Sequence, residues 1–203
     1  MATVLYYGLE PKKQDKAVDR MDVRAQLIKT GRYLLDRQLA WGTSGNISAR
    51  TDADRMIITA SGTFMGELSA DDFAEYEIAT GAWQGGRKGS KETPFHLAIY
   101  RRRPDVQAIL HASPFYTTLI ACSKADIPSE LFIETMYYLE DVAYVDYAHP
   151  GTSDLAEAIG SKAGSANVII MKNHGVVVFD DSLREAQMRL ETLEMACRMI
   201  VTA

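Results

Sequence analysis

The sequence predicts an α/β fold in which helices cover the faces of a central sheet. Residues 16–40 carry apolar residues at helical spacing, and short β-like runs separated by polar turns follow them. The second half of the chain repeats this mixture. The chain has 203 residues, of which 47% are hydrophobic, so it can bury a sizeable core of the size usual for one domain. We therefore expect a single domain over residues 1–203.

In the first half, the apolar spacing over residues 16–40 indicates an amphipathic helix or a helix pair. Short β-like runs bounded by polar residues then predict strands at 46–50, 56–60 and 76–79. Helical spacing over 93–102 stops before Pro104, because proline cannot continue a helix. An apolar strand is expected at 106–111, followed by a helix over 114–122 with a proline in its first turn.

The second half is expected to contain three more strands and two more helices. Apolar runs predict strands at 142–147, 168–173 and 175–179, and helical spacing predicts a helix at 153–163. Asp180, Asp181 and Ser182 offer an N-cap for a last helix that ends near Val201. The buried face of that helix is expected to include Leu183, Ala186, Leu190, Leu193, Met195 and Cys197.

Composition excludes several classes of partner. The net charge is −5, and the 22 basic residues are mixed with 27 acidic ones, so no basic stripe for nucleic acid is expected. The run at 101–103 is interpreted as the solvated end of a helix. No apolar run approaches the roughly 20 residues that span a bilayer. Cys122 and Cys197 lie in apolar stretches and no secretion signal is recognised, so we expect a reduced, cytoplasmic protein.

Polar residues gather at the ends of apolar elements, where α/β folds collect functional side chains. They are the turns at 42–46 and 60–63, Ser90-Lys91-Glu92, and the histidines His111 and His174. Glycines in the two turns would let the backbone approach a phosphate or carboxylate, while amide and hydroxyl groups donate hydrogen bonds. The same glycines would also suit tight connections between strands, and the residues alone leave both interpretations open.

The titratable residues also have two interpretations each. Glu92 precedes a helix, so it either charges the helix N-terminus or is a carboxylate near a metal that moves a proton. His111 and His174 each follow an apolar strand, where a histidine is either a satisfied core residue or a metal ligand. His96 lies within a helix after Phe95 and is interpreted as a packing or hydrogen-bonding residue.

Five ordered motifs decide between these interpretations. They are Gly-Thr-x-Gly-Asn-Ile-Ser at 42–48, Ile-Thr-Ala-Ser-Gly at 58–62, Ser-Lys-Glu-x-x-x-His at 90–96, Arg-Pro-Asp then Ile-Leu-His at 103–111, and Asn-His-Gly at 173–175. Together they resemble the class II aldolase and adducin head family, whose nearest well-understood pattern is that of L-fuculose-phosphate aldolase. The resemblance covers nearly the whole chain, and the joint order of the motifs is specific although each motif alone is not.

The resemblance implies a three-layer α/β/α fold with a central, mainly antiparallel sheet, and a catalytic zinc or another divalent cation. It also implies a homotetramer with active sites between neighbouring subunits. In this pattern Glu92 matches the acid/base carboxylate, and His111 and His174 match two of three imidazole ligands. The positions around a substrate phosphate match Thr43, Asn46, Ser61, Gly62 and Ser90, and Lys91 would add a charge to the same anion site.

The sequence departs from the family pattern at the metal site and at one acid. The family has His-x-His at the strand end, whereas this chain has His111-Ala112-Ser113, and a serine hydroxyl is a much poorer zinc ligand than imidazole. The residues that could complete the site are Glu92, His149 and Glu134. Phe132 stands where the aldolase has a tyrosine acid, and Tyr137 or Tyr138 could replace it or pack at an interface.

These residues predict a divalent-metal-dependent lyase that acts on a small, phosphorylated or carboxylated hydroxy-carbonyl compound. A bound cation would polarise the carbonyl and stabilise an enediolate during retro-aldol cleavage or decarboxylation, while Glu92 moves the proton. Epimerases and dehydratases of the family share this chemistry, and the sequence does not choose among them. The alternative is a non-catalytic binding or assembly module, as in adducin heads, although the retained Glu92, His111 and His174 argue against complete loss of the site.

Overall fold

The structure, a computed structural model, describes residues 22–203. The strands are β1 (Asn46–Arg50), β2 (Arg55–Thr59), β3 (Phe73–Glu77), β4 (Trp83–Gly86), β5 (Ala108–Ala112), β6 (Val142–Val145), β7 (Val168–Met171) and β8 (Gly175–Asp180). The helices are α1 (Val23–Asp36), α2 (Thr93–Arg102), α3 (Phe115–Ala121), α4 (Ile133–Tyr138), α5 (Ser153–Lys162) and α6 (Leu183–Thr202), with a short 3₁₀ turn η1 (Met65–Glu67). The start of the helix expected at 16–40 lies outside the described residues.

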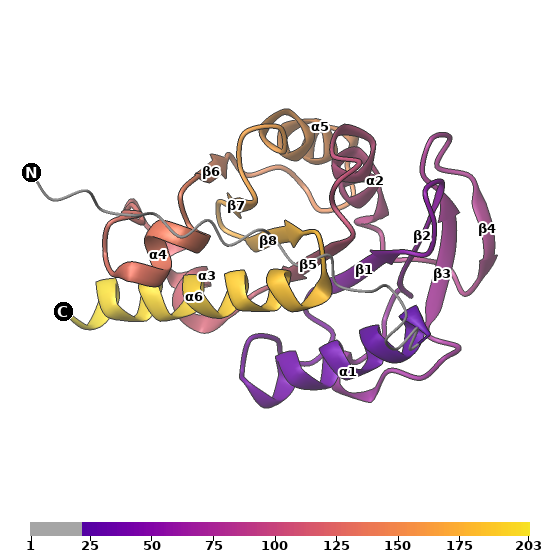
Figure 1. The fold of residues 1–203 in the computed structure, drawn as a ribbon, viewed down its shortest axis with the longest axis horizontal. Coiled ribbons are helices and arrows are strands. Elements are labelled where there is room, and N and C mark those ends of the chain that lie inside the picture. The colour runs from indigo at the N-terminus through magenta and orange to yellow at the C-terminus, as the bar shows by residue number, and fades with distance from the viewer. Residues whose placement is uncertain (1–21) are drawn as a thin grey trace, which may run out of the picture.

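One sheet of eight strands forms the centre of the molecule, in the order β4-β3-β2-β1-β5-β8-β7-β6. Every neighbouring pair is antiparallel except β6 and β7, which are parallel. Helices α2 and α5 cover one face, and α1, α3 and α6 cover the other (Figure 1). The expected three-layer α/β/α fold with a mainly antiparallel sheet is therefore confirmed. The expectation of a single domain over residues 1–203 stays a prediction.

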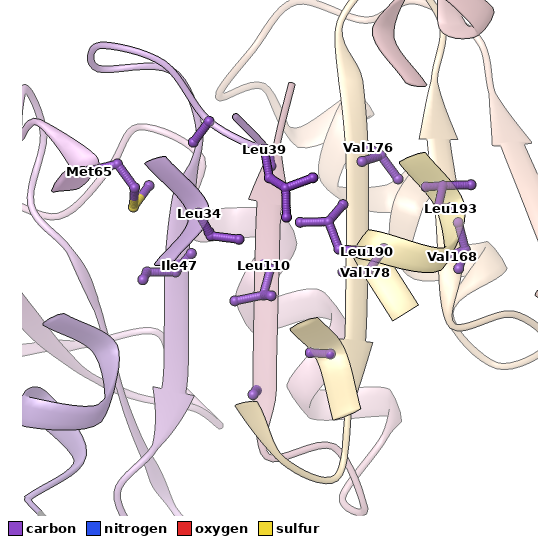
Figure 2. Close-up of a cluster of buried hydrophobic side chains, with 14 of the residues drawn as sticks. Leu34, Leu39, Ile47, Met65, Leu110, Val168, Val176, Val178, Leu190 and Leu193 are labelled. Atoms are coloured by element: carbon purple, nitrogen blue, oxygen red, sulfur yellow. The ribbon is translucent and has the colours of Figure 1, made fainter. Parts of the chain in front are cut away.

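The two faces of the sheet bury two separate apolar clusters. Because side chains alternate along a strand, Leu110 of β5 points toward α6, whereas its neighbour Ile109 points toward α2. Figure 2 shows the first cluster, in which Leu34 of α1, Leu110 of β5 and Leu190 of α6 lie close together. The strands β7 and β8 are buried on both sides and are largely apolar on both faces, which explains the continuous apolar runs in this part of the sequence. The same alternation turns His111 toward α2, and this places it in the functional site.

Several element boundaries differ from those expected. The third strand is β3 at Phe73–Glu77 and not 76–79, and the edge strand β4 and the short helix α4 were not expected at all. Strand β4 has the sequence Trp-Gln-Gly-Gly, lies at the sheet edge and is largely exposed, so it lacks an apolar pattern. The Ser182 hydroxyl caps α6 by accepting a hydrogen bond from the backbone N–H of Glu185, as expected for a residue at this position.

Five of the six residues expected on the buried face of α6 pack into the apolar cluster, although Leu183 is only partly buried. Ala186, Leu190, Leu193 and Cys197 are fully buried, whereas Met195 is 51% exposed. Met195 lies two positions after Leu193, about 200° round the helix, and so points away from the sheet. No helix within residues 22–203 is long and apolar enough to cross a membrane.

Candidate active site

Four segments that are distant in the sequence bring the predicted site residues together. Asn46 begins β1 and lies directly opposite His111 on β5. His174 lies in the tight turn between β7 and β8. Glu92 is the N-cap residue of α2, the helix that covers this face of the sheet. The strand register and the position of one helix end therefore create the site.

The Glu92 carboxylate lies between the two histidine rings. Its Oε2 is 3.2 Å from Nε2 of His111, and its Oε1 is 3.2 Å from Nε2 of His174. The side-chain amide of Asn46 also donates a hydrogen bond from Nδ2 to Oε2, at 2.7 Å. Glu92 is only 5% exposed and His111 only 2%, so little water screens their interaction. The structure thus brings the predicted proton carrier and both predicted imidazole ligands into one cluster.

Glu92 also occupies the place that a helix-charging acid would take. It precedes the first residue of α2, but its side chain makes no capping hydrogen bond. The partial positive charge of the helix N-terminus still favours its anionic form. The two interpretations of Glu92 are therefore compatible, because an acid at the start of the helix has its carboxylate directed at the histidines.

Glu92 and His111 shift each other's pKa. Burial alone would raise the pKa of Glu92, but the interactions with His111 and then His174 outweigh it and hold this pKa far below its ordinary value of 4.5. Burial alone would lower the pKa of His111, but the charge of Glu92 outweighs it and raises this pKa above 6.5. The carboxylate is therefore ionised at neutral pH.

The donor set fits a divalent cation. Nδ1 of His111 lies 2.9 Å from the backbone carbonyl of Val176, which can only accept, so Nδ1 carries a ring proton, and Nε2, which faces Glu92, would give its lone pair to a metal ion after losing its own proton. The ligand atoms of Glu92, His111 and His174 all lie within 4.8 Å of one another. Two imidazoles and one carboxylate are the protein ligands of one class of catalytic zinc site and also bind other first-row ions. The cluster of Glu92, His111 and His174 could therefore hold a metal ion.

Two unpaired atoms support this fit. Among the described residues, Oε1 of Glu92 and Nδ1 of His174 are buried without a hydrogen bond. A buried carboxylate oxygen without a donor is unfavourable unless a cation or a ligand meets it. Of the three residues considered for completing the metal site, Glu92 joins the cluster, whereas His149 and Glu134 are exposed and lie outside it.

A cavity of about 470 Å³ opens beside the cluster, which is within the usual size of small-molecule sites. All of the residues predicted for the site line it: Thr43, Asn46, Ser61, Gly62, Ser90, Lys91, Glu92, His111 and His174. Ser113 lines it as well, and its hydroxyl donates to the backbone carbonyl of His174 at 3.4 Å. The cavity therefore has anionic and cationic groups together with several hydroxyls, as a small polar substrate requires.

The glycines of the two small-residue turns are needed for the backbone. Gly45 has a φ of +84°, and a Cβ there would lie 2.4 Å from the carbonyl oxygen of His111. Gly62 has a φ of +77° and faces open space. Both turns are therefore tight connections that require glycine, and both also border the cavity. Their role in anion binding stays a prediction.

The sequence also matches a known protein family. The family model described as Class II Aldolase and Adducin N-terminal domain matches residues 25–201. The chain belongs to this family. L-fuculose phosphate aldolase of Methanocaldococcus jannaschii is 34% identical over 176 residues, which cover 87% of this chain and 94% of that protein.

Two further proteins are similar to this class II aldolase family member in sequence or structure. 3-oxo-tetronate 4-phosphate decarboxylase of Haemophilus influenzae is 32% identical over 180 residues, which cover 87% of this chain and 85% of that protein. The crystal structure of YgbL from Klebsiella pneumoniae has a TM-score of 0.81 and 34% identity, and the match covers 88% of each chain. The curated relatives are named as enzymes, which supports the predicted enzyme.

The tyrosines considered as replacements for the family acid lie elsewhere. Tyr137 is 77% exposed and lines a separate cavity with Arg103 and Arg189. Its ring packs edge-to-face against Tyr138, with centroids 5.1 Å apart. Among the described residues that line the Glu92 cavity there is no tyrosine. In residues 22–203 of this class II aldolase family member, no tyrosine hydroxyl therefore lines the site.

Sequence reasoning missed some of the residues around the cavity. Trp41 is 66% exposed and borders it beside the first glycine turn, and Pro150 borders it from another loop. In the sequence, the only feature that could have indicated Trp41 is its position next to Gly42, and no motif indicated Pro150. The expectation that His96 makes hydrogen bonds is confirmed, because its Nε2 lies 2.6 Å from Oδ1 of Asn46. That contact connects His96 indirectly with Glu92.

Proposed function

We propose that this protein is a divalent-metal-dependent lyase that forms an enediolate from a small phosphorylated hydroxy-carbonyl compound. The observation that carries this proposal is the buried Glu92 carboxylate, which lies 3.2 Å from both His111 and His174 in a polar cavity. His111, His174 and Glu92 would hold the metal ion. When bound, a divalent cation supplies a Lewis acid that polarises the substrate carbonyl.

Glu92 is the residue suited to move the proton. Its Oε2 accepts the hydrogen bond from Asn46, whereas its Oε1 accepts no hydrogen bond and meets Nε2 of His174 at 3.2 Å, so Oε1 is the oxygen better placed to take a proton from a substrate hydroxyl. The depressed pKa keeps it ionised before the substrate arrives. It would later return the proton to the carbon at which the bond has broken.

The hydroxyl and ammonium groups along the cavity would bind the substrate phosphate. The proposed residues are Thr43, Asn46, Ser61, Gly62, Ser90 and Lys91. Asn46 uses one amide N–H for Glu92, and an amide has a second one for a phosphate oxygen. Lys91 is exposed at the cavity mouth, where its charge would attract an anionic substrate.

Within this class, we propose decarboxylation rather than retro-aldol cleavage. In retro-aldol cleavage, the hydroxyl on the departing carbon must lose its proton, and this step needs a second acid/base group. In decarboxylation, carbon dioxide leaves without that step. The described lining of the cavity includes no tyrosine that could serve, and one relative is named as a 3-oxo-tetronate 4-phosphate decarboxylase.

The proposal is tested with the purified protein loaded separately with Zn²⁺, Co²⁺ and Mn²⁺. Carbon dioxide release from 3-oxo-tetronate 4-phosphate and aldehyde release from L-fuculose 1-phosphate are measured for each metal. Turnover is expected only with metal. In Glu92→Gln it is expected to fall by about 100-fold or more, the usual size of a general acid/base contribution. Glu134→Gln removes an exposed carboxylate outside the cavity and is the matched control, with turnover expected within twofold of wild type.

Each alternative has its own result in this experiment. Aldehyde release without carbon dioxide would assign the protein to retro-aldol cleavage. Full activity of the metal-free protein would overturn the metal mechanism. A protein that binds none of the three ions and converts neither compound would favour the non-catalytic binding or assembly module.

We also propose that the protein is a cytoplasmic homotetramer. Large apolar side chains are strongly exposed on α3 and α4, with Phe115 at 69% and Ile133 at 79%, and such patches usually mark contacts with another chain. Both cysteines, Cys122 and Cys197, lie in the described part of the chain and are free thiols, as a reducing compartment allows. Light scattering after size-exclusion chromatography measures the mass, and a monomer would contradict the tetramer.

A further inference from the structure

Beneath Glu92 lies a series of buried polar side chains that the proposed reaction does not use. The hydroxyl of Tyr100 is 3.0 Å from Oγ of Ser48, and Ser48 Oγ is 2.7 Å from Nδ1 of His96. Nε2 of His96 is 2.6 Å from Oδ1 of Asn46, whose Nδ2 donates to Glu92 at 2.7 Å. All of these residues are buried. We call Tyr100, Ser48, His96 and Asn46 the Tyr100–Asn46 chain.

The direction of every hydrogen bond in the Tyr100–Asn46 chain follows from its end at Glu92. An ionised carboxylate can only accept, so the NH₂ group of Asn46 faces Glu92 and its carbonyl oxygen faces His96. That carbonyl can only accept, so Nε2 of His96 carries the proton that it donates. The opposite amide orientation would place two acceptors against each other at Glu92.

The neutral state of His96 fixes the rest of the chain. Burial, together with the charge of His111, lowers the pKa of His96 to about 3, so the ring has one proton at neutral pH. With that proton on Nε2, Nδ1 accepts from the hydroxyl of Ser48. The Ser48 oxygen in turn accepts from the hydroxyl of Tyr100. Every donor in the Tyr100–Asn46 chain therefore points toward Glu92.

The two carboxylate oxygens of Glu92 have different surroundings. Oε2 receives the hydrogen bond from Asn46, and Oε1 lies 3.2 Å from Nε2 of His174 without a hydrogen bond. We propose that the Tyr100–Asn46 chain positions Glu92, so that Oε2 is fixed and Oε1 is the oxygen that meets the metal and moves the proton. His96 and Ser48 are then positioning residues that act through Asn46. The assignment of a task to Oε1 rests on the proposed function, whereas the orientation of the chain does not.

Stability alone does not account for the Tyr100–Asn46 chain. Replacing both partners of a buried hydrogen bond with apolar groups of the same shape can be nearly neutral for stability, so an apolar core could serve equally well here. Phe95 stacks on the His96 ring, with centroids 4.6 Å apart and an interplanar angle of 20°, so the ring is held in one orientation. An ordered polar chain that ends on a single carboxylate is the arrangement needed to orient that carboxylate.

The direction of the chain is tested by nuclear magnetic resonance on the full-length protein with ¹⁵N-labelled histidine. The protein has only four histidines, so the His96→Gln spectrum assigns the His96 signals. We expect the tautomer with a proton on Nε2 and a lone pair on Nδ1, throughout the range from about pH 6 to pH 8 given the low pKa of His96. A proton on Nδ1 in this range would overturn the proposal. This measurement needs neither metal nor substrate.

The effect on Glu92 is tested by titrating Co²⁺ into the protein and following its visible absorption. His96→Phe keeps a ring but removes both hydrogen bonds, and we expect about 10- to 100-fold weaker Co²⁺ binding, as for other groups that orient metal ligands. His96→Gln keeps an amide N–H for Asn46 and is expected to restore binding to within a few-fold of wild type. Folded variants that all bind Co²⁺ like wild type would overturn the proposal.

A second variant covers the case in which His96→Phe does not fold. Ser48→Ala removes one hydroxyl and is expected to weaken Co²⁺ binding by about 2- to 10-fold, the effect of one hydrogen bond. Unchanged Co²⁺ binding in a folded Ser48→Ala protein would contradict the proposal. If wild type binds no Co²⁺, the proposed function fails, and the tautomer of His96 still decides whether the chain has this direction.

Discussion

The two helical layers that cover the sheet bury different kinds of side chain. On the side of α6, apolar residues such as Leu34, Leu110 and Leu190 form the centre of the cluster. On the side of α2, the apolar cluster surrounds buried His96 and His111, which lead to the buried Glu92. Among the described residues, every buried histidine and carboxylate lies on the α2 side.

The two faces of the sheet therefore have different roles: the α6 side stabilises the fold, and the α2 side positions the residues of the site. Burial of apolar surface stabilises the fold by roughly 25 cal/mol per Å². Buried polar groups add little net stability even when all their hydrogen bonds are formed, but they fix side-chain orientation. We therefore expect substitutions on the α6 side to change the free energy of unfolding, and substitutions on the α2 side to change metal binding and turnover.

The largest effect is expected for Leu190→Ala on the α6 side. Leu190 is fully buried, so the substitution leaves a cavity and lowers the free energy of unfolding by about 2–5 kcal/mol. Urea denaturation measures this loss. Met195→Ala on the same helix is the matched control, because Met195 is 51% exposed and the change is expected to stay within about 0.5 kcal/mol. Equal losses in the two variants would contradict the burial pattern of α6.

An intermediate effect is expected for Ser113→His on the α2 side. The Ser113 hydroxyl borders the cavity and donates only weakly, to the carbonyl of His174, so an imidazole there would add a fourth metal ligand. We expect zinc to bind roughly tenfold tighter or more, because imidazole is a much better zinc ligand than a hydroxyl. Competition with a chelating dye measures the affinity. Unchanged zinc affinity would mean that the site is already complete or is not a metal site.

The smallest effect is expected from pH, and it concerns the metal-free protein. The folded pKa of His111 is raised, so its contribution to stability is full below pH 6.5 and is lost as the pH rises through the folded value. The folded pKa of Glu92 is lowered, so its contribution is present above pH 4.5 and is lost only as the pH falls toward the folded value. The pair should therefore stabilise the protein most between about pH 4.5 and pH 6.5.

Denaturation of the chelator-treated protein across this pH range measures the effect. In Glu92→Gln, the loss of stability above pH 6.5 is expected to disappear, because His111 no longer has a charged partner. Leu190→Ala should lower the stability by the same amount at every pH, because it removes no charge. A pH slope that persists in Glu92→Gln would show that another group causes it.

Short elements and single side-chain directions were the parts of the fold that the sequence did not predict. Helix α4 has only 6 residues and β4 only 4, which is too few to establish a period. The exposure of Met195 depends on its angle around α6, which the list of apolar residues in that helix did not reveal. A helix cap at Asp180, Asp181 or Ser182 was predicted, because a cap is a local interaction, and the structure shows that Ser182 provides it.

The sequence by itself determined the α/β class, most of the elements and most of the residues that line the cavity, because apolar periodicity and motif order are local properties of the chain. Only the tertiary structure decided that Glu92 lies between His111 and His174, and that His96 reaches it through Asn46. Asn46 and Glu92 are 46 residues apart in sequence, and their contact depends on the register of β1 against β5 and on where α2 begins. Those relations arise from packing across the whole sheet, which no single segment of the sequence specifies.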